Sequence, residues 1–375
     1  MRQRQMKVSD VTAVVDSIVP LRLAQDWDNV GLLVGDAGQI VRNILLTIDV
    51  TAEVVAEAKK LKTDLIISYH PVIWDGLKKV TAERPTSLVY ELIRAGISVF
   101  SVHTALDTVP GGLNDALAET LGIENPQPLG DFVQDPRAEN FKLVVFVPLD
   151  SLGEVREAVF AAGAGRIGSY THCGFSAEGT GTFLPLEGAR PAVGSKGNLE
   201  KVREVRFETI VPADRLDAVI AAMSKAHPYE TPAFDLFKLR NPTARLGLGR
   251  IGTLARPARL EDLIEKISRR TGAKVVGIIG KQRRLVKKAA VCAGSCGKII
   301  EAVIAARAEL YVTGELKHHH ALAARQAGLT CICLGHSVSE RFILKKFAGQ
   351  LKKRLNTITI NISRKDTDPF TWKNI

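Results

Sequence analysis

Short, continuously apolar runs separated by helix-length segments constrain the fold of this chain more than any other feature. Residues 64–68 and 97–102 form two such runs, and a helical pattern covers 86–95 between them. Strands that are apolar on both faces are typical of parallel sheets with helices on either side. The repeated alternation indicates β-α-β units, so we predict an α/β fold with a parallel sheet from residue 8 to about 138.

The same alternation returns near the C-terminus, where we predict strands at 288–293, 309–313 and 330–334. The middle of the chain differs. There, two predicted strands, at 141–147 and 205–211, each lead through a Val-Pro pair into a helix, which suggests two β-α-β halves as in ferredoxin-like α+β domains. We therefore predict an outer α/β body from residues 1–138 and 241–375, with residues 139–240 inserted into it. Two independent domains would leave similar local patterns.

The bulk composition favours a globular protein of two or three domains that acts in the cytoplasm. The chain has 375 residues, 46% of them hydrophobic and 24% charged. Its five cysteines are odd in number and form no C-x-x-C pair, as expected in a reducing compartment. No apolar run approaches the ~20 residues that cross a bilayer, and no apolar signal core follows the charged N-terminus. We therefore expect no membrane partner.

The net charge of +11 raises nucleic-acid binding as a further possibility. The positive charge is spread along the chain, with local clusters at 281–288 and 345–354, and the second cluster resembles one face of a helix. This distribution favours a solvated surface over a nucleic-acid groove, so we do not expect a nucleic-acid partner.

Four potential metal ligands lie just past the ends of apolar runs. His70 follows the run at 64–68, Asp107 closes 99–107, and His336 and Glu340 follow 330–335 with the i, i+4 spacing of one helix face. Ligands of parallel α/β sheets bind outside the carboxyl ends of the strands. Imidazoles and carboxylates gathered there suit a divalent metal ion.

Each of these residues also has a structural interpretation. A single histidine after a strand can be a satisfied polar residue, and Asp107 could cap the turn before Pro110. Glu340 could complement the dipole of a helix that starts near His336. The joint occurrence of four potential ligands at three strand ends keeps the metal site open as the alternative.

Several longer motifs give the chain a resemblance to a known family. They are Trp27-Asp28-Asn29-Val30-Gly31-Leu32-Leu33-Val34-Gly35, Tyr69-His70-Pro71, His103-Thr104-Ala105-Leu106-Asp107, Gly168-Ser169-Tyr170-Thr171-His172-Cys173-Gly174-Phe175, His227-Pro228-Tyr229-Glu230-Thr231-Pro232, Thr313-Gly314-Glu315 and Gly335-His336-Ser337-Val338-Ser339-Glu340. With them, nearly the whole chain resembles the GTP cyclohydrolase I type 2 homologue family, also called NGG-interacting-factor-three-like or dinuclear-metal-centre hexameric proteins. The middle segment resembles the PII/CutA-like insert of its long bacterial members.

The resemblance implies two adjacent metal ions per chain, of the zinc or iron/manganese type, in a pocket of the outer body. It places His70, Asp107, His336 and Glu340 at ligand positions, with Glu340 touching both ions. It also implies a toroidal homo-hexamer, and the family label suggests the opening of the GTP ring.

Tyr69 departs from the family pattern, which has a second histidine before the His-Pro pair. A neutral phenol with a pKa of ~10 is a poorer zinc ligand than imidazole, whereas a phenolate would favour a harder ion such as ferric iron. We therefore predict one well-held ion and a second that is weak or altered.

These features predict a metal-dependent hydrolase of a nucleotide-like or other phosphate-bearing small molecule. His103 is a candidate for general acid/base catalysis or for supporting a metal ligand, although it could equally bond the backbone. The alternative function is a non-catalytic, metal-binding or regulatory assembly. The turn at 293–297 is rich in glycine but lacks the lysine of a nucleotide-binding loop.

Overall fold

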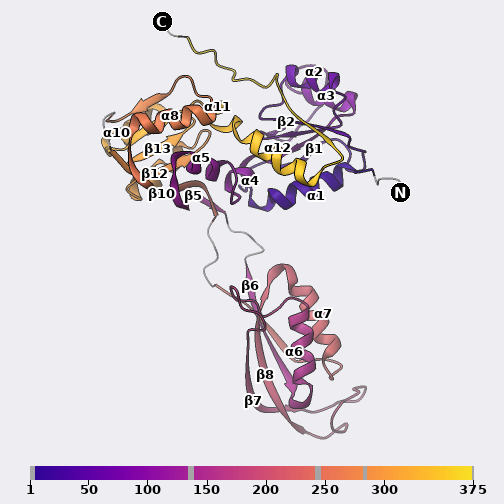
Figure 1. Ribbon diagram of the computed structural model, residues 1–375. Coiled ribbons are helices and arrows are strands. Elements are labelled where there is room, and N and C mark those ends of the chain that lie inside the picture. The colour runs from indigo at the N-terminus through magenta and orange to yellow at the C-terminus, as the bar shows by residue number, and fades with distance from the viewer. Residues whose placement is uncertain (1–4, 134–138, 241–245, 282–284, 374–375) are drawn as a thin grey trace. The chain divides into compact units, whose positions relative to one another are not determined.

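The computed structural model describes residues 5–133, 139–240, 246–281 and 285–373. The chain forms two compact units, one from Met1–Val133 with Arg245–Ile375 and the other from Gln134–Ala244. The domain boundaries expected after residues 138 and 240 each adjoin a range outside the described residues, and they remain predictions. Both units mix helices and strands, so the α/β class is confirmed (Figure 1).

The first unit contains a five-stranded sheet with the strand order β1-β4-β3-β2-β15. Its strands are β1 (Gly31–Val34), β2 (Asn43–Thr47), β3 (Leu65–Ser68), β4 (Ser98–Ser101) and β15 (Thr359–Ile362). The last four run parallel, and β1 lies antiparallel to β4 at the edge. Because β15 pairs with β2, the two ends of the chain share one sheet.

Helices cover both faces of this sheet, which explains why its strands are apolar on successive residues. They are α1 (Val8–Ile18), α2 (Ala52–Lys60), α3 (Ser87–Ala95) and α12 (Ile343–Arg354). Ile44 and Leu46 of β2 join the core that includes α1 and α12, whereas Leu45 between them joins the core of α2 and α3. Neighbouring residues of a strand point to opposite faces, so each face of β2 needs its own apolar partner.

A second sheet of the same unit has six strands in the order β11-β14-β13-β12-β10-β5. Its strands are β5 (Ile123–Val133), β10 (Leu246–Arg259), β11 (Gly277–Ile279), β12 (Leu285–Cys292), β13 (Leu310–Thr313) and β14 (Thr330–Cys333). Only β12, β13 and β14 run parallel to one another. The expectation of a parallel α/β body is therefore corrected to two mixed sheets, because β5, β10 and β11 all pair antiparallel.

The remaining helices of this unit lie along the chain between or after these strands. They are α4 (His103–Thr108), α5 (Leu113–Leu121), α8 (Leu260–Thr271), α9 (Ile300–Ala305), α10 (His318–Gln326) and α11 (His336–Arg341). One continuous apolar core includes residues of both sheets, such as Ile67 of β3 and Ile332 of β14. The two sheets therefore form a single packed body.

Arg250 ties the second sheet to α4 and α5. Its side chain on β10 is 3% exposed, donates to the Asp115 carboxylate at 2.6 Å, and donates to the carbonyl oxygen of Thr108 at 2.9 Å. Arg250→Met should lower the free energy of unfolding by about 3 kcal/mol, because it removes the buried guanidinium that pairs with Asp115 and donates to the Thr108 carbonyl oxygen. Urea unfolding measures the change, and Arg256→Met on an exposed part of β10 is the control. Equal, small changes in the two variants would contradict this role.

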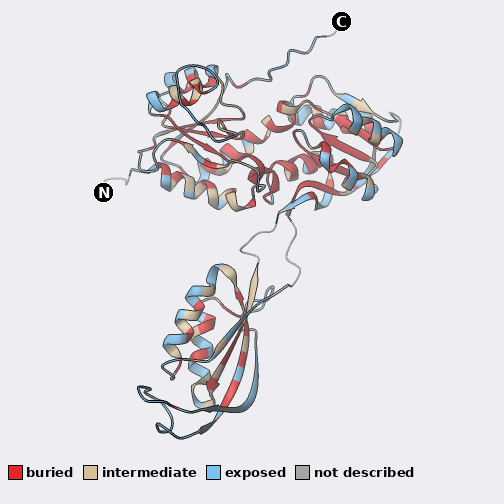
Figure 2. Ribbon diagram, turned by 180° about the vertical axis from the view of Figure 1, so that it is seen from behind, coloured by how far each residue is buried: buried red, intermediate tan, exposed pale blue. Residues whose placement is uncertain are grey.

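The second unit is a four-stranded antiparallel sheet with the order β7-β8-β6-β9. Its elements follow the chain as β6 (Asn140–Pro148), α6 (Leu152–Ala161), β7 (Gly174–Phe183), β8 (Glu200–Pro212), α7 (Leu216–Ala226) and β9 (Phe234–Lys238). Both helices pack on the same apolar face, where Val145 of β6 and Phe207 of β8 are buried (Figure 2). The glycine-rich β7 was not predicted, because it has no apolar alternation.

The described helices include none with the length and apolar character needed to cross a membrane.

Candidate metal centre

Three of the four predicted ligands meet where the two sheets of the first unit face each other. His70 lies two residues after β3 of the five-stranded sheet, and His336 and Glu340 lie on α11 after β14 of the six-stranded sheet. One ligand atom from each residue can be chosen so that all three atoms lie within 4.8 Å of one another. The carboxyl ends of parallel strands from both sheets therefore supply this cluster.

Glu340 lies at the centre of the cluster and is 2% exposed. Its Oε1 is 3.2 Å from Nε2 of His336, and its Oε2 is 3.6 Å from Nε2 of His70. Oε2 is buried without a hydrogen-bond partner among the described residues. A buried carboxylate that faces one imidazole with each oxygen, and has one oxygen without a donor, fits a cation. The two-nitrogen, one-oxygen donor set suits zinc, iron or manganese.

Two further carboxylates orient the histidines. Asp49 lies 2.9 Å from Nδ1 of His70, and Glu315 lies 3.0 Å from Nδ1 of His336. Such bonds hold each ring so that Nε2 is the nitrogen left for a metal, and they raise the basicity of the ligand. Burial alone would raise the pKa of Asp49, but the hydrogen bond and charge of His70 outweigh it and hold that pKa below its usual value.

Asp49 was not predicted as a site residue, although it lies two residues after an apolar strand, as His70 does. It follows β2 as His70 follows β3, at the carboxyl end of a parallel strand. Glu315 follows β13 in the same way and belongs to a motif of the family resemblance.

Removing the charge of Asp49 should weaken metal binding without removing a ligand. We expect Asp49→Asn to lower the affinity for a divalent ion by about 10- to 100-fold, because His70 loses the carboxylate that orients its ring. Competition against a metallochromic chelator measures the change. Asp131→Asn, in the same pocket but with no side-chain bond to either histidine among the described contacts, is the control. An unchanged affinity in Asp49→Asn would show that His70 is not held through Asp49.

Asp107 lies outside this cluster of described residues, and Tyr69 binds it instead. The Tyr69 hydroxyl donates to Asp107 Oδ1 at 2.6 Å, and both side chains are buried. Burial raises the pKa of Asp107 to about 6. Burial, followed by the charges of Asp107 and Glu340, raises the pKa of Tyr69 well above its usual value. The phenol therefore keeps its proton, which disfavours the phenolate ligand considered from the sequence.

His103 occupies the first position of α4, one helical turn before Asp107. The expected strand thus ends at Ser101, and both residues lie on a helix. Nδ1 of His103 is 2.8 Å from Asp28, which also accepts a hydrogen bond from the backbone N–H of Thr104 at 3.0 Å. Asp28 therefore positions His103, so His103 bonds a carboxylate and not the backbone through this nitrogen.

The three clustered residues line a cavity of about 740 Å³, together with Asp49 and Glu315. The predicted residues on its wall are Tyr69, His70, His103, Asp107, His336 and Glu340. The glycine-rich turn at 293–297 also lines it, and a Cβ on Gly294, where φ is +71°, would lie 2.6 Å from Glu340 Oε1. This turn therefore brings backbone close to the cluster, which explains the glycine without a phosphate-binding role. Of the three consecutive histidines, His320 lines the cavity, whereas His318 and His319 are exposed.

The family is decided by a match that runs through almost the entire chain. The sequence model of Duf34/NIF3 (NGG1p interacting factor 3) matches residues 6–369. The chain belongs to the Duf34/NIF3 family. One family relative, the GTP cyclohydrolase 1 type 2 homolog of Bacillus subtilis, is 36% identical over 366 residues, which covers 96% of this chain and 97% of that protein. The homolog of the same name from Mycobacterium tuberculosis is 40% identical over 342 residues, covering 89% and 88%.

Solved structures of related proteins match the Duf34/NIF3 chain over its length. A Bacillus cereus protein related to NIF3 superimposes with a TM-score of 0.83 at 36% identity, covering 99% of this chain and 100% of that one. Staphylococcus aureus protein SA1388 gives a TM-score of 0.81 at 28% identity, with the same coverage.

Metal binding to this Duf34/NIF3 chain should release a proton. The hydrogen bond from His336 to Glu340, together with the bond to Glu315, raises the pKa of His336 to about 10 in the metal-free site. Its imidazole is therefore protonated at pH 7 and must lose that proton before it can ligate an ion. The apparent binding enthalpy is measured by calorimetric titration in two buffers of different ionisation enthalpy. The difference between the two enthalpies should correspond to the release of at least about one proton per ion. Identical apparent enthalpies in both buffers would contradict this expectation.

Proposed function

We propose that this chain is a metal-dependent hydrolase of a nucleotide-like or other phosphate-bearing small molecule. The single observation that carries the proposal is Glu340, a buried carboxylate that faces His336 through Oε1 and His70 through Oε2, the oxygen that lacks a donor. Other carboxylates orient both histidines. That arrangement supports a catalytic ion site on the wall of a cavity large enough for a small-molecule substrate.

We assign one divalent ion of the zinc or iron/manganese type to His70, His336 and Glu340. The proposal of a weak or altered second ion rests on Tyr69, because its hydroxyl donates a hydrogen bond to Asp107, a predicted ligand. When bound, a divalent ion in such a site polarises a phosphoryl or carbonyl oxygen and acidifies water.

The other residues of the cavity would bind substrate and move protons. His103, with Nδ1 held by Asp28, would accept or donate a proton at Nε2, as an oriented histidine does in other hydrolases. Lys298 and Lys317, both exposed on the cavity wall, would attract the anionic group of the substrate. Trp27 and Trp74, whose rings lie 5.9 and 5.4 Å from the His103 ring, would shield that histidine from bulk water.

The family label suggests GTP as one substrate, and the reaction it names can be tested directly. Metal-loaded protein is incubated with GTP, and formate release is measured beside phosphate release from a set of nucleotides and phosphate esters. Formate release would support the ring-opening reaction, and phosphate release alone would support hydrolysis of a phosphate-bearing compound. Absence of turnover on every compound under metal supplementation would count against the hydrolase.

A non-catalytic, metal-binding or regulatory assembly is the second candidate function. The bond between Tyr69 and Asp107 favours it, because a site with one ligand position blocked can hold an ion without turning over substrate. Glu340→Ala separates the two functions: an enzyme should lose turnover and keep its assembly, whereas a structural ion should leave a less stable oligomer.

We also propose that the second unit is a ferredoxin-like domain of the PII/CutA type, inserted at about 139–240, and that the chain forms a homo-hexamer in the cytoplasm. The β-α-β-β-α-β element order and the sheet order β7-β8-β6-β9 support the domain proposal. Light scattering should give six times the chain mass, and a monomer at micromolar concentration would exclude the hexamer.

A further inference from the structure

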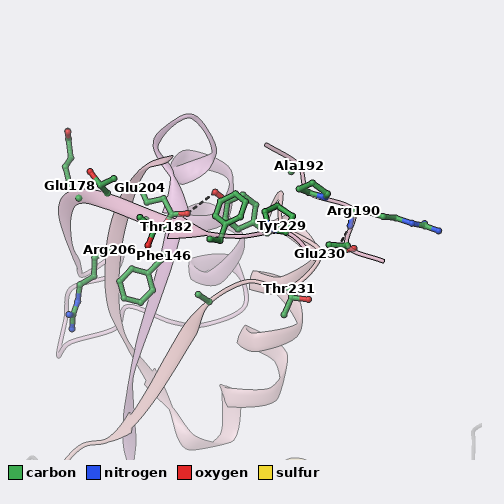
Figure 3. A pocket seen from close by; sticks show the side chains of 18 of the residues that line it. Phe146, Glu178, Thr182, Arg190, Ala192, Glu204, Arg206, Tyr229, Glu230 and Thr231 are labelled. Atoms are coloured by element: carbon green, nitrogen blue, oxygen red, sulfur yellow. Dashed lines mark hydrogen bonds between the residues drawn. The ribbon is translucent and has the colours of Figure 1, made fainter. Parts of the chain in front are cut away.

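The second unit has a cavity of its own that the proposed metal chemistry does not use. It measures about 630 Å³ and lies among β7, β8, the segment 185–192 and the segment 229–233 (Figure 3). All of its lining residues belong to this unit, and its volume is in the range of small-molecule sites.

Glu204 supplies a buried carboxylate to this cavity. The residue is on β8 and is 8% exposed. Its Oε1 accepts a hydrogen bond from the Tyr229 hydroxyl at 2.9 Å (Figure 3). Its Oε2 has no hydrogen-bond partner in the contacts of the described residues, and a Cβ on Gly181 would come within 2.1 Å of that oxygen. The absence of a side chain at Gly181 thus leaves room for the carboxylate beside β7.

The positive side chains around the cavity do not neutralise Glu204. Arg206 bonds Glu208 at 2.8 Å, and Arg203 bonds Glu178. The Arg190 side chain extends away from the Glu204–Tyr229 pair (Figure 3). No ion pair among the described residues includes Glu204, so its only bound partner is a neutral phenol. Glu204 therefore presents an unpaired negative charge to the cavity, and a ligand that brings a positive charge would form an ion pair there, partly shielded from water by the cavity wall.

Aromatic rings form the apolar part of the wall. The rings of Tyr229 and Phe183 are 5.7 Å apart in an edge-to-face contact, and Phe146 lines the cavity from β6. Aromatic faces attract cations as well as flat apolar groups. These rings and the carboxylate therefore both favour a ligand that carries a positive charge on a flat apolar body.

The motif at residues 227–232, which lies outside the metal centre, holds this wall in place. His227, 6% exposed, lies 2.9 Å from the carbonyl oxygen of Phe146 through Nε2, and its Nδ1 accepts from the backbone N–H of Tyr229 at 3.1 Å. This pattern requires a neutral ring with the proton on Nε2. His227 therefore fixes the backbone that presents Tyr229 to Glu204.

We propose that this cavity binds a small organic cation, an amidinium or a protonated amine on a flat apolar body, with its charge against Glu204 and its body against the rings of Tyr229, Phe183 and Phe146. The site is independent of the metal centre and would give the second unit a ligand-sensing role.

Three probes of nearly equal shape test the proposal on the full-length chain: benzamidine, neutral benzamide and anionic benzoate. In calorimetric or ligand-observed NMR titrations, benzamidine should bind wild-type protein about tenfold or more tightly than benzamide, and benzoate should bind least. Glu204→Gln keeps the shape of the side chain and an acceptor for Tyr229. It should lower the benzamidine affinity by about tenfold or more and leave benzamide unchanged. Glu178→Gln, on the same wall but paired with Arg203, should leave both affinities unchanged and is the matched control.

Several results would overturn the proposal. They are no benzamidine binding to wild type, equal binding of all three probes, and a Glu204→Gln variant that binds benzamidine as wild type does. Since the charge order of the probes is measured on wild type alone, the test holds even if Glu204→Gln does not fold.

Discussion

Glu340→Gln should lower the affinity of the chain for a divalent ion by more than about 100-fold, since outer carboxylates alone contribute about 10- to 100-fold at such sites. The substitution keeps the length and shape of the side chain and removes only its charge. Glu340 is the one carboxylate that lies within 3.6 Å of both histidines, so no other described residue can replace it. Metal content after dialysis against a weak chelator measures the loss, and Glu301→Gln on an exposed face of α9 is the control.

Thermal unfolding of the metal-free proteins separates lost binding from lost structure. Without an ion, Glu340 pairs through Oε1 with His336, whose raised pKa keeps its imidazole protonated at pH 7, so the neutral glutamine should lower the midpoint at that pH. In the presence of the ion, wild type should gain stability and Glu340→Gln should not. A Glu340→Gln variant that gains as much stability from the ion as wild type does would mean that Glu340 does not hold the ion.

Tyr69→His should raise the metal content from about one ion per chain to about two, because it frees Asp107 and adds an imidazole beside it. Wild-type Asp107 accepts a hydrogen bond from the Tyr69 hydroxyl at 2.6 Å, and burial raises the pKa of that phenol well above its usual value. Elemental analysis of protein purified without chelators measures the ratio.

Tyr69→Phe is the matched control for this substitution. It removes the same hydrogen bond from Asp107 but supplies no ligand, so its metal content should stay at that of wild type. Two tightly held ions in the wild-type chain would contradict the account, since Tyr69 would then not limit the site.

The strands that carry the site were predictable because they are buried on both faces. β3 and β4 are buried at every residue, as is most of β14, and such strands show up as continuous apolar runs. β5 and β10 were not predictable in the same way. β5 contains Pro126 and Pro128, and β10 alternates glycine with larger residues near its start. Their strand conformation depends on pairing with each other across more than a hundred residues of chain, which no local pattern reveals.

The residues of the candidate site also differ in whether the sequence could predict them. His70, His336 and Glu340 could be predicted because each follows an apolar strand, and helical spacing alone placed the last two on one face. The bond between Asp28 and His103 joins residues 75 positions apart, and the bond from Tyr69 to Asp107 spans 38. Those contacts depend on the fold placing α4 beside Tyr69, which follows β3, and beside Asp28, which precedes β1. Sequence alone therefore indicated the ligands but not the residues that orient or block them.

The central claim is that His70, His336 and Glu340 hold a divalent ion. Anomalous diffraction from crystals of zinc- or manganese-loaded protein, collected on both sides of the metal absorption edge, tests it most directly. The account predicts one strong peak between Nε2 of His70, Nε2 of His336 and the Glu340 carboxylate, with Tyr69 still bonded to Asp107. Absence of a peak at these three residues in metal-loaded crystals would contradict it.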